Sequence, residues 1–117
     1  MTKNQNFSKR KLASVIRGAA NRIEKYGFIK NEFGSSKEGY CALGAVRAEA
    51  SPRHRSDPSQ LSYEAGVALR EYISKTFGEF SVPGFNDAPE TNKQTVVRVM
   101  RGCARALEHG FTPGLRF

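Results

Sequence analysis

The clearest helical signal in this chain is VVRVMRGCARAL at positions 96–107. Apolar residues recur along it every three or four positions, as on one face of an α-helix. They are Val96, Met100, Cys103, Ala104 and Leu107. Arginines form a separate stripe at positions 98, 101 and 105. The pattern predicts a surface helix that begins at Thr91, buries its apolar stripe in a core and ends before Gly110.

Two other helices are predicted by the residues at their ends. The first begins at an N-cap, Ser8, and ends at Gly27, which suits a left-handed C-cap. The third begins where Asp57 can cap and Pro58 fits the first helical position, and it ends at Gly78. Between these signals, apolar residues follow helical spacing in both segments.

The remaining segments are a short helix and two connections. A second helix is placed at about 41–50 and is expected to end at Ser51-Pro52. Residues 28–39 are rich in turn formers and predict a loop with a small hairpin around Gly34. Residues 79–90 predict a second long connection with a short turn.

These elements predict an all-α, compact domain of about four helices with two structured loops. At 117 residues the chain is long enough for one hydrophobic core, so residues 1–117 are expected to form a single domain. Within it, residues 1–7 are expected to be a loose N-terminus and residues 111–117 a tail.

Composition narrows the environment and the class of partner. The formal net charge is +8, which favours acidic partners such as nucleic acid or an acidic protein surface. The polar N-terminus predicts no signal peptide, and the apolar runs are too short to predict a membrane span. The two cysteines lie far apart and form no disulfide framework. A cytoplasmic protein with reduced thiols and no membrane partner is therefore expected.

Two short motifs restrict the chain more than their surroundings do: GYCALGA at 39–45 and FNDAP at 85–89. Cys41 stands where a helix begins, and the helix dipole there favours the thiolate. A catalytic cysteine would need a base, His54 or His109, and an orienting group, Asn86 or Asp87. The alternative is structural: a small buried cysteine that packs a tight helix.

The residues of the second motif also have structural roles to fill. Phe85 can plug the core, Asn86 can stabilise a turn, and Asp87 can cap the helix that follows. Asp87 with Glu90, and Thr91 with Gln94, have the spacing of capping boxes. The alternative hypothesis is that Cys41, Asn86 and Asp87 line a ligand pocket.

Small residues in the second helix predict a close contact. Gly44, Ala45 and Ala48 share helical spacing, which lets a neighbouring helix approach closely.

The soft metal ligands in the sequence are Cys41, His54, Cys103 and His109, and their spacing matches no zinc pattern. No metal and no cofactor are expected.

The arginines are the candidate binding residues. They are Arg98, Arg101 and Arg105 on the last helix, with Arg53 and Arg55 in the loop after the second. A charged stripe opposite an apolar stripe is normally the solvated face of a surface helix. Acids are few on the last helix, however, and phosphate binding needs several cations on one surface. No helix-turn-helix, zinc-finger or RNA-binding signature accompanies them.

The chain resembles a group of small uncharacterised proteins from actinobacteria and their bacteriophages. The resemblance is carried by Cys41-Ala42-Leu43-Gly44-Ala45, by the Phe85-Asn86-Asp87 turn and by the Thr91-led last helix. It covers most of the chain, with Phe85 where that group more often has tryptophan. It implies the fold and an origin, and it implies no activity.

Three hypotheses about function follow. The first is a small non-enzymatic binding protein, a phage accessory factor by analogy, which engages an acidic host protein or nucleic acid through its basic surface. The second is a thiol enzyme or small-ligand binder centred on Cys41, with Asn86 and Asp87. The third is a structural module that forms a homo-oligomer through its tail, anchored by Leu115 and Phe117.

Overall fold

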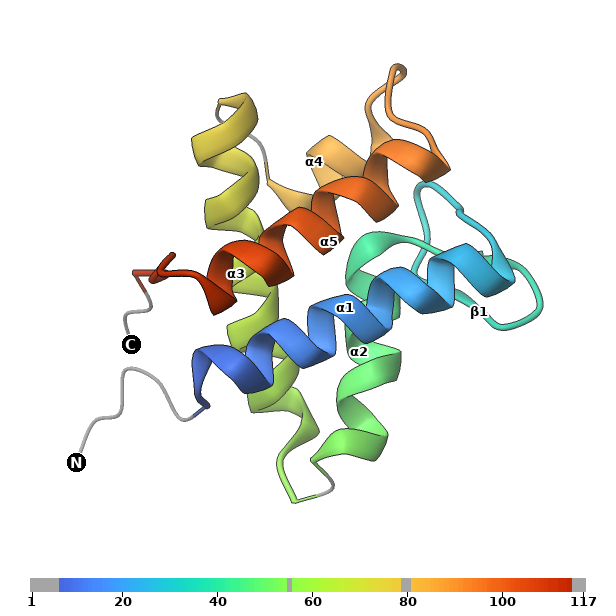
Figure 1. Ribbon diagram of the computed structural model, residues 1–117. Helices are drawn as coiled ribbons and strands as arrows, with labels where there is room; N and C mark the ends of the chain where they lie inside the picture. The colour runs from blue at the N-terminus through green and yellow to red at the C-terminus, as the bar shows by residue number, and fades with distance from the viewer. Residues whose placement is uncertain (1–6, 55, 79–80, 115–117) are drawn as a thin grey trace.

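The computed structural model describes residues 7–54, 56–78 and 81–114, and within them the chain folds into five α-helices and one two-stranded hairpin (Figure 1). In chain order the elements are α1 (Lys9–Tyr26), β1 (Gly34–Ser35), β2 (Gly39–Tyr40), α2 (Ala42–Arg53), α3 (Pro58–Phe77), α4 (Val82–Asp87) and α5 (Lys93–Glu108). The prediction of an all-α domain is confirmed. Among the described residues, no helix is long and apolar enough to cross a membrane.

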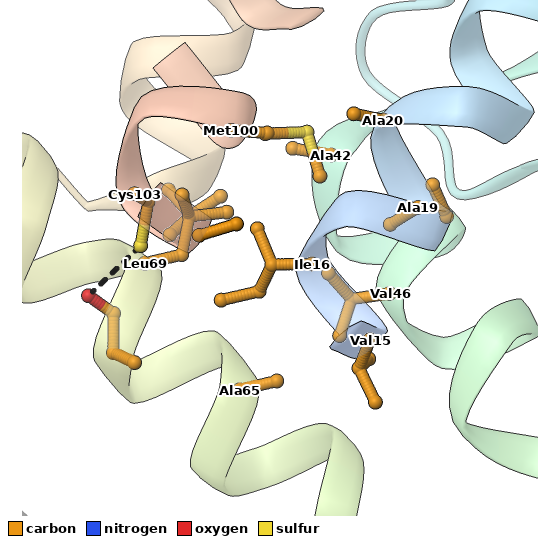
Figure 2. Close-up of a cluster of buried hydrophobic side chains, with 14 of the residues drawn as sticks. Val15, Ile16, Ala19, Ala20, Ala42, Val46, Ala65, Leu69, Met100 and Cys103 are labelled. Atoms are coloured by element: carbon orange, nitrogen blue, oxygen red, sulfur yellow. Dashed lines mark hydrogen bonds between the residues drawn. The ribbon is translucent and has the colours of Figure 1, made fainter. Parts of the chain in front are cut away.

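Helices α1 and α5 lie side by side and run antiparallel (Figure 1). Both are strongly amphipathic, and their apolar stripes face α2 and α3 across one core. Figure 2 shows Ile16 of α1 between Met100 of α5, Leu69 of α3 and Val46 of α2. These four side chains are almost completely buried, so the core joins all four long helices.

The predicted ends of α1 and α3 are confirmed. The Ser8 hydroxyl accepts a hydrogen bond from the first turn of α1, and Gly27 ends that helix with φ at 109°. Asp57 caps α3, Pro58 occupies its first position and Gly78 ends it with φ at 97°. The two glycines adopt a backbone conformation that other residues rarely reach.

The predicted end of α2 is wrong by one turn. The helix continues through Pro52 to Arg53, and His54 closes it with a backbone bond to Ala50. Because Pro52 lies in the last turn, it removes only one helical hydrogen bond. Arg53 bonds back to Glu49 one turn earlier, which holds this turn in place.

The start of α5 also differs from the prediction. Its N-cap is Asn92, whose side-chain oxygen accepts a hydrogen bond from the Thr95 N–H at 2.9 Å, while Thr91 is buried one position earlier. Asp87 is the last residue of α4 and does not cap α5. The expected short turn in 79–90 is instead the six-residue helix α4, capped by Ser81.

The hairpin predicted around Gly34 is present and lies against the start of α2. Gly34 pairs with Tyr40, and Ser35 pairs with Gly39. Directly after β2, the Cys41 N–H donates to the Phe33 carbonyl oxygen. The loop before the hairpin is thereby fixed beside the first turn of α2.

Candidate functional site

The positive charge of the chain is concentrated on α1 and α5. Helix α1 carries six lysines and arginines and one acid, and α5 carries four and one. Their combined excess of eight positive charges equals the formal net charge of the whole chain, +8. The rest of the sequence holds nine basic and nine acidic residues and is balanced. We call the exposed surface of these two helices the α1–α5 face.

The two acids of this face join the helices to each other. Arg17 of α1 forms an ion pair with Glu108 of α5 at 2.7 Å, and its hydrogen bond lowers the pKa of Glu108 below the ordinary value. Arg101 of α5 lies 3.4 Å from the Glu24 carboxylate and donates to Asn21 at 3.0 Å. Arg101 therefore already has partners within the fold.

The other two arginines of the predicted stripe are exposed. Among the described residues, no ion pair involves Arg98 or Arg105. Arg10, on α1, is exposed in the same way. These arginines are exposed to solvent, and a guanidinium group can exchange water for an anionic group at little cost in desolvation.

Arg53 is a structural clamp in this structure. Its guanidinium binds Glu49 at 2.6 Å and Ser14 of α1 at 2.6 Å. Arg22 of α1 binds the other oxygen of Glu49, also at 2.6 Å. Burial acts to raise the pKa of Glu49, but the hydrogen bonds from both arginines outweigh it and hold that pKa below its ordinary value. Arg55 lies outside the described residues.

The three pocket candidates meet at one hollow. Cys41, Asn86 and Asp87 line a cavity of about 380 Å³ between the loop at 31–33, the start of α2 and α4. The two motifs predict a pocket that uses these residues, and in the structure all three line the same hollow.

The Cys41 thiol is arranged as a helix cap. Its sulfur accepts a hydrogen bond from the Gly44 N–H at 3.2 Å. Burial raises the pKa of Cys41, so the thiol stays protonated at neutral pH. No histidine is among the residues that line the described hollow: His54 lies edge-on against the Phe7 ring, and His109 ends α5. Neither of the two histidines predicted as a base for Cys41 is therefore at this hollow.

Asn86 and Asp87 act as a latch. The Asn86 oxygen accepts from the Ala42 N–H at 2.9 Å, and its NH₂ group donates to the Ile29 carbonyl at 3.2 Å and to Asp87 at 2.9 Å. Asp87 in turn accepts from the Asn31 N–H at 2.9 Å. The Asn86 amide and the Oδ1 oxygen of Asp87 are therefore committed to structural bonds. Phe85 is buried, as predicted for a core plug.

Gly44 of α2 fits against a loop rather than a helix. A Cβ at Gly44 would overlap the Phe33 carbonyl oxygen, so only glycine allows this close approach. Ala45 is buried in the core and Ala48 is half-buried beside it. The expectation of a closely packed neighbouring helix at Gly44 is wrong, because its neighbour is the backbone before the hairpin.

The hollow continues into a second one that the sequence motifs did not predict. Phe33, Leu43, Val82 and Pro83 line both, and the second hollow, about 350 Å³, extends to residues of α2 and α3. Phe33 and Tyr63 are among the exposed large apolar side chains. The sequence held a signal for both: Phe33 stands in a polar loop, and Tyr63 falls off the apolar stripe of its helix.

The tail folds back onto its own domain as far as it is described. Phe111 lies edge-on to Tyr72, and the Gly114 N–H donates to Glu71 at 2.7 Å. Leu115 and Phe117, the predicted anchors of an oligomer, lie outside the described residues. Among the residues that are described, no group of three metal-ligating side chains comes together.

Comparison with known proteins places most of the chain in one family model. The model is described as a family of unknown function (DUF6197), and it matches residues 8–106. That range includes α1 to α4 and all but the last residues of α5. No curated protein matches the chain, and no solved structure matches it.

Proposed function

The chain belongs to the DUF6197 family, whose function is unknown, and we propose that it is a small non-enzymatic binding protein that engages an acidic partner through its α1–α5 face. The partner is a host protein with an acidic surface or a nucleic acid. The observation that carries this proposal is the location of the charge: the excess on α1 and α5 equals the net charge of the chain.

This charge distribution gives a different electric field from that of an evenly basic surface. Charges spread over a molecule give a weak field in every direction, whereas charges gathered on two adjacent helices give a field that orients an approaching polyanion. Arg98 and Arg105 are exposed on this face, and neither is in an ion pair within the described part of the chain. They are the residues we assign to the contact, with Arg101 positioned between them and tied to α1.

The resemblance to proteins of actinobacteria and their bacteriophages supports a partner in a bacterial cytoplasm. A phage accessory factor works there by binding a component of the host. We propose this origin and location together with the binding role.

The first experiment measures affinity for labelled duplex DNA and single-stranded RNA by fluorescence anisotropy from low to physiological salt. For the double variant Arg98→Ala/Arg105→Ala we expect weaker binding and a salt slope smaller by about one for each phosphate that the protein no longer neutralises. The matched control is Lys37→Ala/Lys75→Ala, which removes two exposed cations outside α1 and α5. Equal reductions in affinity for both variants would contradict a specific face, and no binding at low salt would exclude a nucleic acid.

The second experiment is affinity capture from a host lysate with the same three baits. Acidic proteins held by the native chain and the control, and absent from the arginine variant, would support a protein partner. If all three baits hold the same proteins, the α1–α5 face is not the contact.

The geometry gives less support to the thiol-enzyme alternative. Burial raises the pKa of Cys41, its sulfur caps α2, and the side chains of Asn86 and Asp87 are engaged in the latch. The oligomer alternative can be checked by deleting residues 111–117 and measuring the mass in solution. If the number of subunits is the same with and without the deletion, the result argues against an oligomer held by the tail.

A further inference from the structure

The two hollows described above form one groove on α2, α3, α4 and the loop at 31–33. No residue of α1 or α5 is among the residues that line it. Its centre consists of the side chains that line both hollows: Phe33, Leu43, Val82 and Pro83. This site is therefore separate from the α1–α5 face.

The two ends of the groove carry opposite charge. At the end near Cys41, the charged residues lining it are Glu32 and Asp87, both acids. At the other end they are Arg47 and Arg70, both bases. Within the described part of the chain Arg47 has no carboxylate partner and lies over the Phe33 ring at 4.4 Å, while Arg70 is 4.0 Å from Glu71 and exposed.

Exposed aromatic rings stand at this groove as well. Phe33 is 52% exposed and Tyr63 is 49% exposed. Tyrosine and arginine are enriched among the residues that dominate binding energy in protein interfaces. The hollows, about 380 and 350 Å³, each have the size of a site for a small ligand, so the joined groove has room for a chain segment with several side chains.

From these observations we propose that the groove binds a short segment of a partner protein. The segment carries two or three apolar side chains for the centre, a basic residue that meets Glu32 and Asp87, and an acidic residue that meets Arg47 and Arg70. A single small molecule would fill one hollow and would not contact both the acids at one end and the bases at the other. A second copy of this chain would present the same concave surface, and two concave surfaces leave space between them.

The experiment selects binders from a random-peptide display library on the native full-length chain. The selected peptides are then synthesised, and their affinity is measured by fluorescence anisotropy. We expect them to share an apolar centre with a basic residue on one side and an acidic residue on the other.

Gly66→Leu is the variant that fills the groove. A Cβ at Gly66 would lie 3.4 Å from Leu43 Cδ2, an ordinary contact, and Gly66 is one of the residues that line the groove, so a larger side chain there takes up space in it. Leucine also favours a helix interior more than glycine does, so the thermal midpoint should be unchanged or higher. We expect at least a tenfold loss of peptide affinity.

Charge reversal tests the direction of the segment. Arg47→Glu/Arg70→Glu should lower the affinity of the protein for the selected peptides. Exchanging the acidic residue of the peptide for lysine should restore that affinity. Arg98→Ala/Arg105→Ala should leave peptide affinity unchanged, which separates this site from the proposed function. Peptides without a shared pattern, or equal affinity for Gly66→Leu, would overturn the proposal. So would a loss of affinity that charge exchange cannot restore, or a dimer of the native chain that Gly66→Leu dissociates.

Discussion

Asn86 of α4 accepts a hydrogen bond from the backbone N–H of Ala42 at 2.9 Å, although 44 positions separate them in the chain. The same amide donates to the Ile29 carbonyl at 3.2 Å. The Asn86 side chain is almost completely buried and so joins α4, the first turn of α2 and the segment before the hairpin. This amide therefore helps to fix the walls of the hollow beside Cys41.

Replacing Asn86 should therefore be costly. Asn86→Ala leaves the buried Ala42 N–H and the Ile29 carbonyl without this partner, and we expect a loss of about 3 kcal/mol in the free energy of unfolding. The control is Asn92→Ala, which removes an exposed N-cap and should cost about 1 kcal/mol. Urea denaturation measures both. Similar small losses in the two variants would show that the latch is not a main support of the fold.

Two glycines on the walls of the same region should respond in opposite ways to alanine. Gly44→Ala drives a Cβ into the Phe33 carbonyl oxygen, a backbone atom that cannot rotate away, and we expect about 3 kcal/mol of destabilisation. Gly66→Ala meets only the end of the Leu43 side chain at 3.4 Å. It should stabilise the protein by up to about 1 kcal/mol through helix propensity. Thermal unfolding of both variants checks the pair, and a tolerated Gly44→Ala would contradict the close approach.

Local signals in the sequence were sufficient where one residue determines the backbone. Ser8, Gly27, Asp57 and Gly78 each have a conformation or a cap that few residues supply, and the structure confirms all four ends. The signals were insufficient where several residues compete. At Thr91 and Asn92 both side chains can cap; in the structure Thr91 is buried and Asn92 is the cap.

The candidate sites depended on contacts between distant segments. The grouping of Cys41 with Asn86 was predicted because both motifs stood out, but the structural role of Asn86 depends on Ala42 and Ile29, which local patterns do not identify. Arg101 differs from Arg98 and Arg105 in having an ion-pair partner, and it has that partner only because α1 brings Glu24 alongside α5. Helical spacing places three arginines on one stripe, and tertiary packing decides which of them has a partner.

The Glu49 clamp predicts a dependence of stability on pH. Its folded pKa lies below the ordinary value near 4.5, so its contribution is fully present above that value and is lost as pH falls through the folded pKa. Glu49→Gln should lower the free energy of unfolding by about 2 kcal/mol at neutral pH, and the difference from the native chain should shrink in acid. Glu108→Gln is the control, because its pair with Arg17 is exposed and should contribute less. Urea denaturation from neutral pH into acid measures both, and a constant difference for Glu49→Gln would contradict the assignment.

The two thiols should react slowly and at different rates. Burial raises the pKa of Cys103 to about 12, and its side chain is fully buried with the sulfur facing the Ala68 carbonyl (Figure 2). Burial also raises the pKa of Cys41, which is half-buried. With iodoacetamide at mildly alkaline pH, we expect Cys41 to react more slowly than in the unfolded chain, and Cys103 to react only as the protein unfolds.

Peptide mass spectrometry of the alkylated protein separates the two sites, and the same reaction in denaturant supplies the reference rate. Cys41→Ser should retain the cap of α2, because serine is a strongly preferred N-cap, whereas Cys41→Ala should cost about 1 kcal/mol. A native Cys41 that reacts faster than the denatured thiol would mean that the start of α2 stabilises the thiolate. That result would contradict the assignment of Cys41 as a helix cap and would support the hypothesis that Cys41 is a nucleophile.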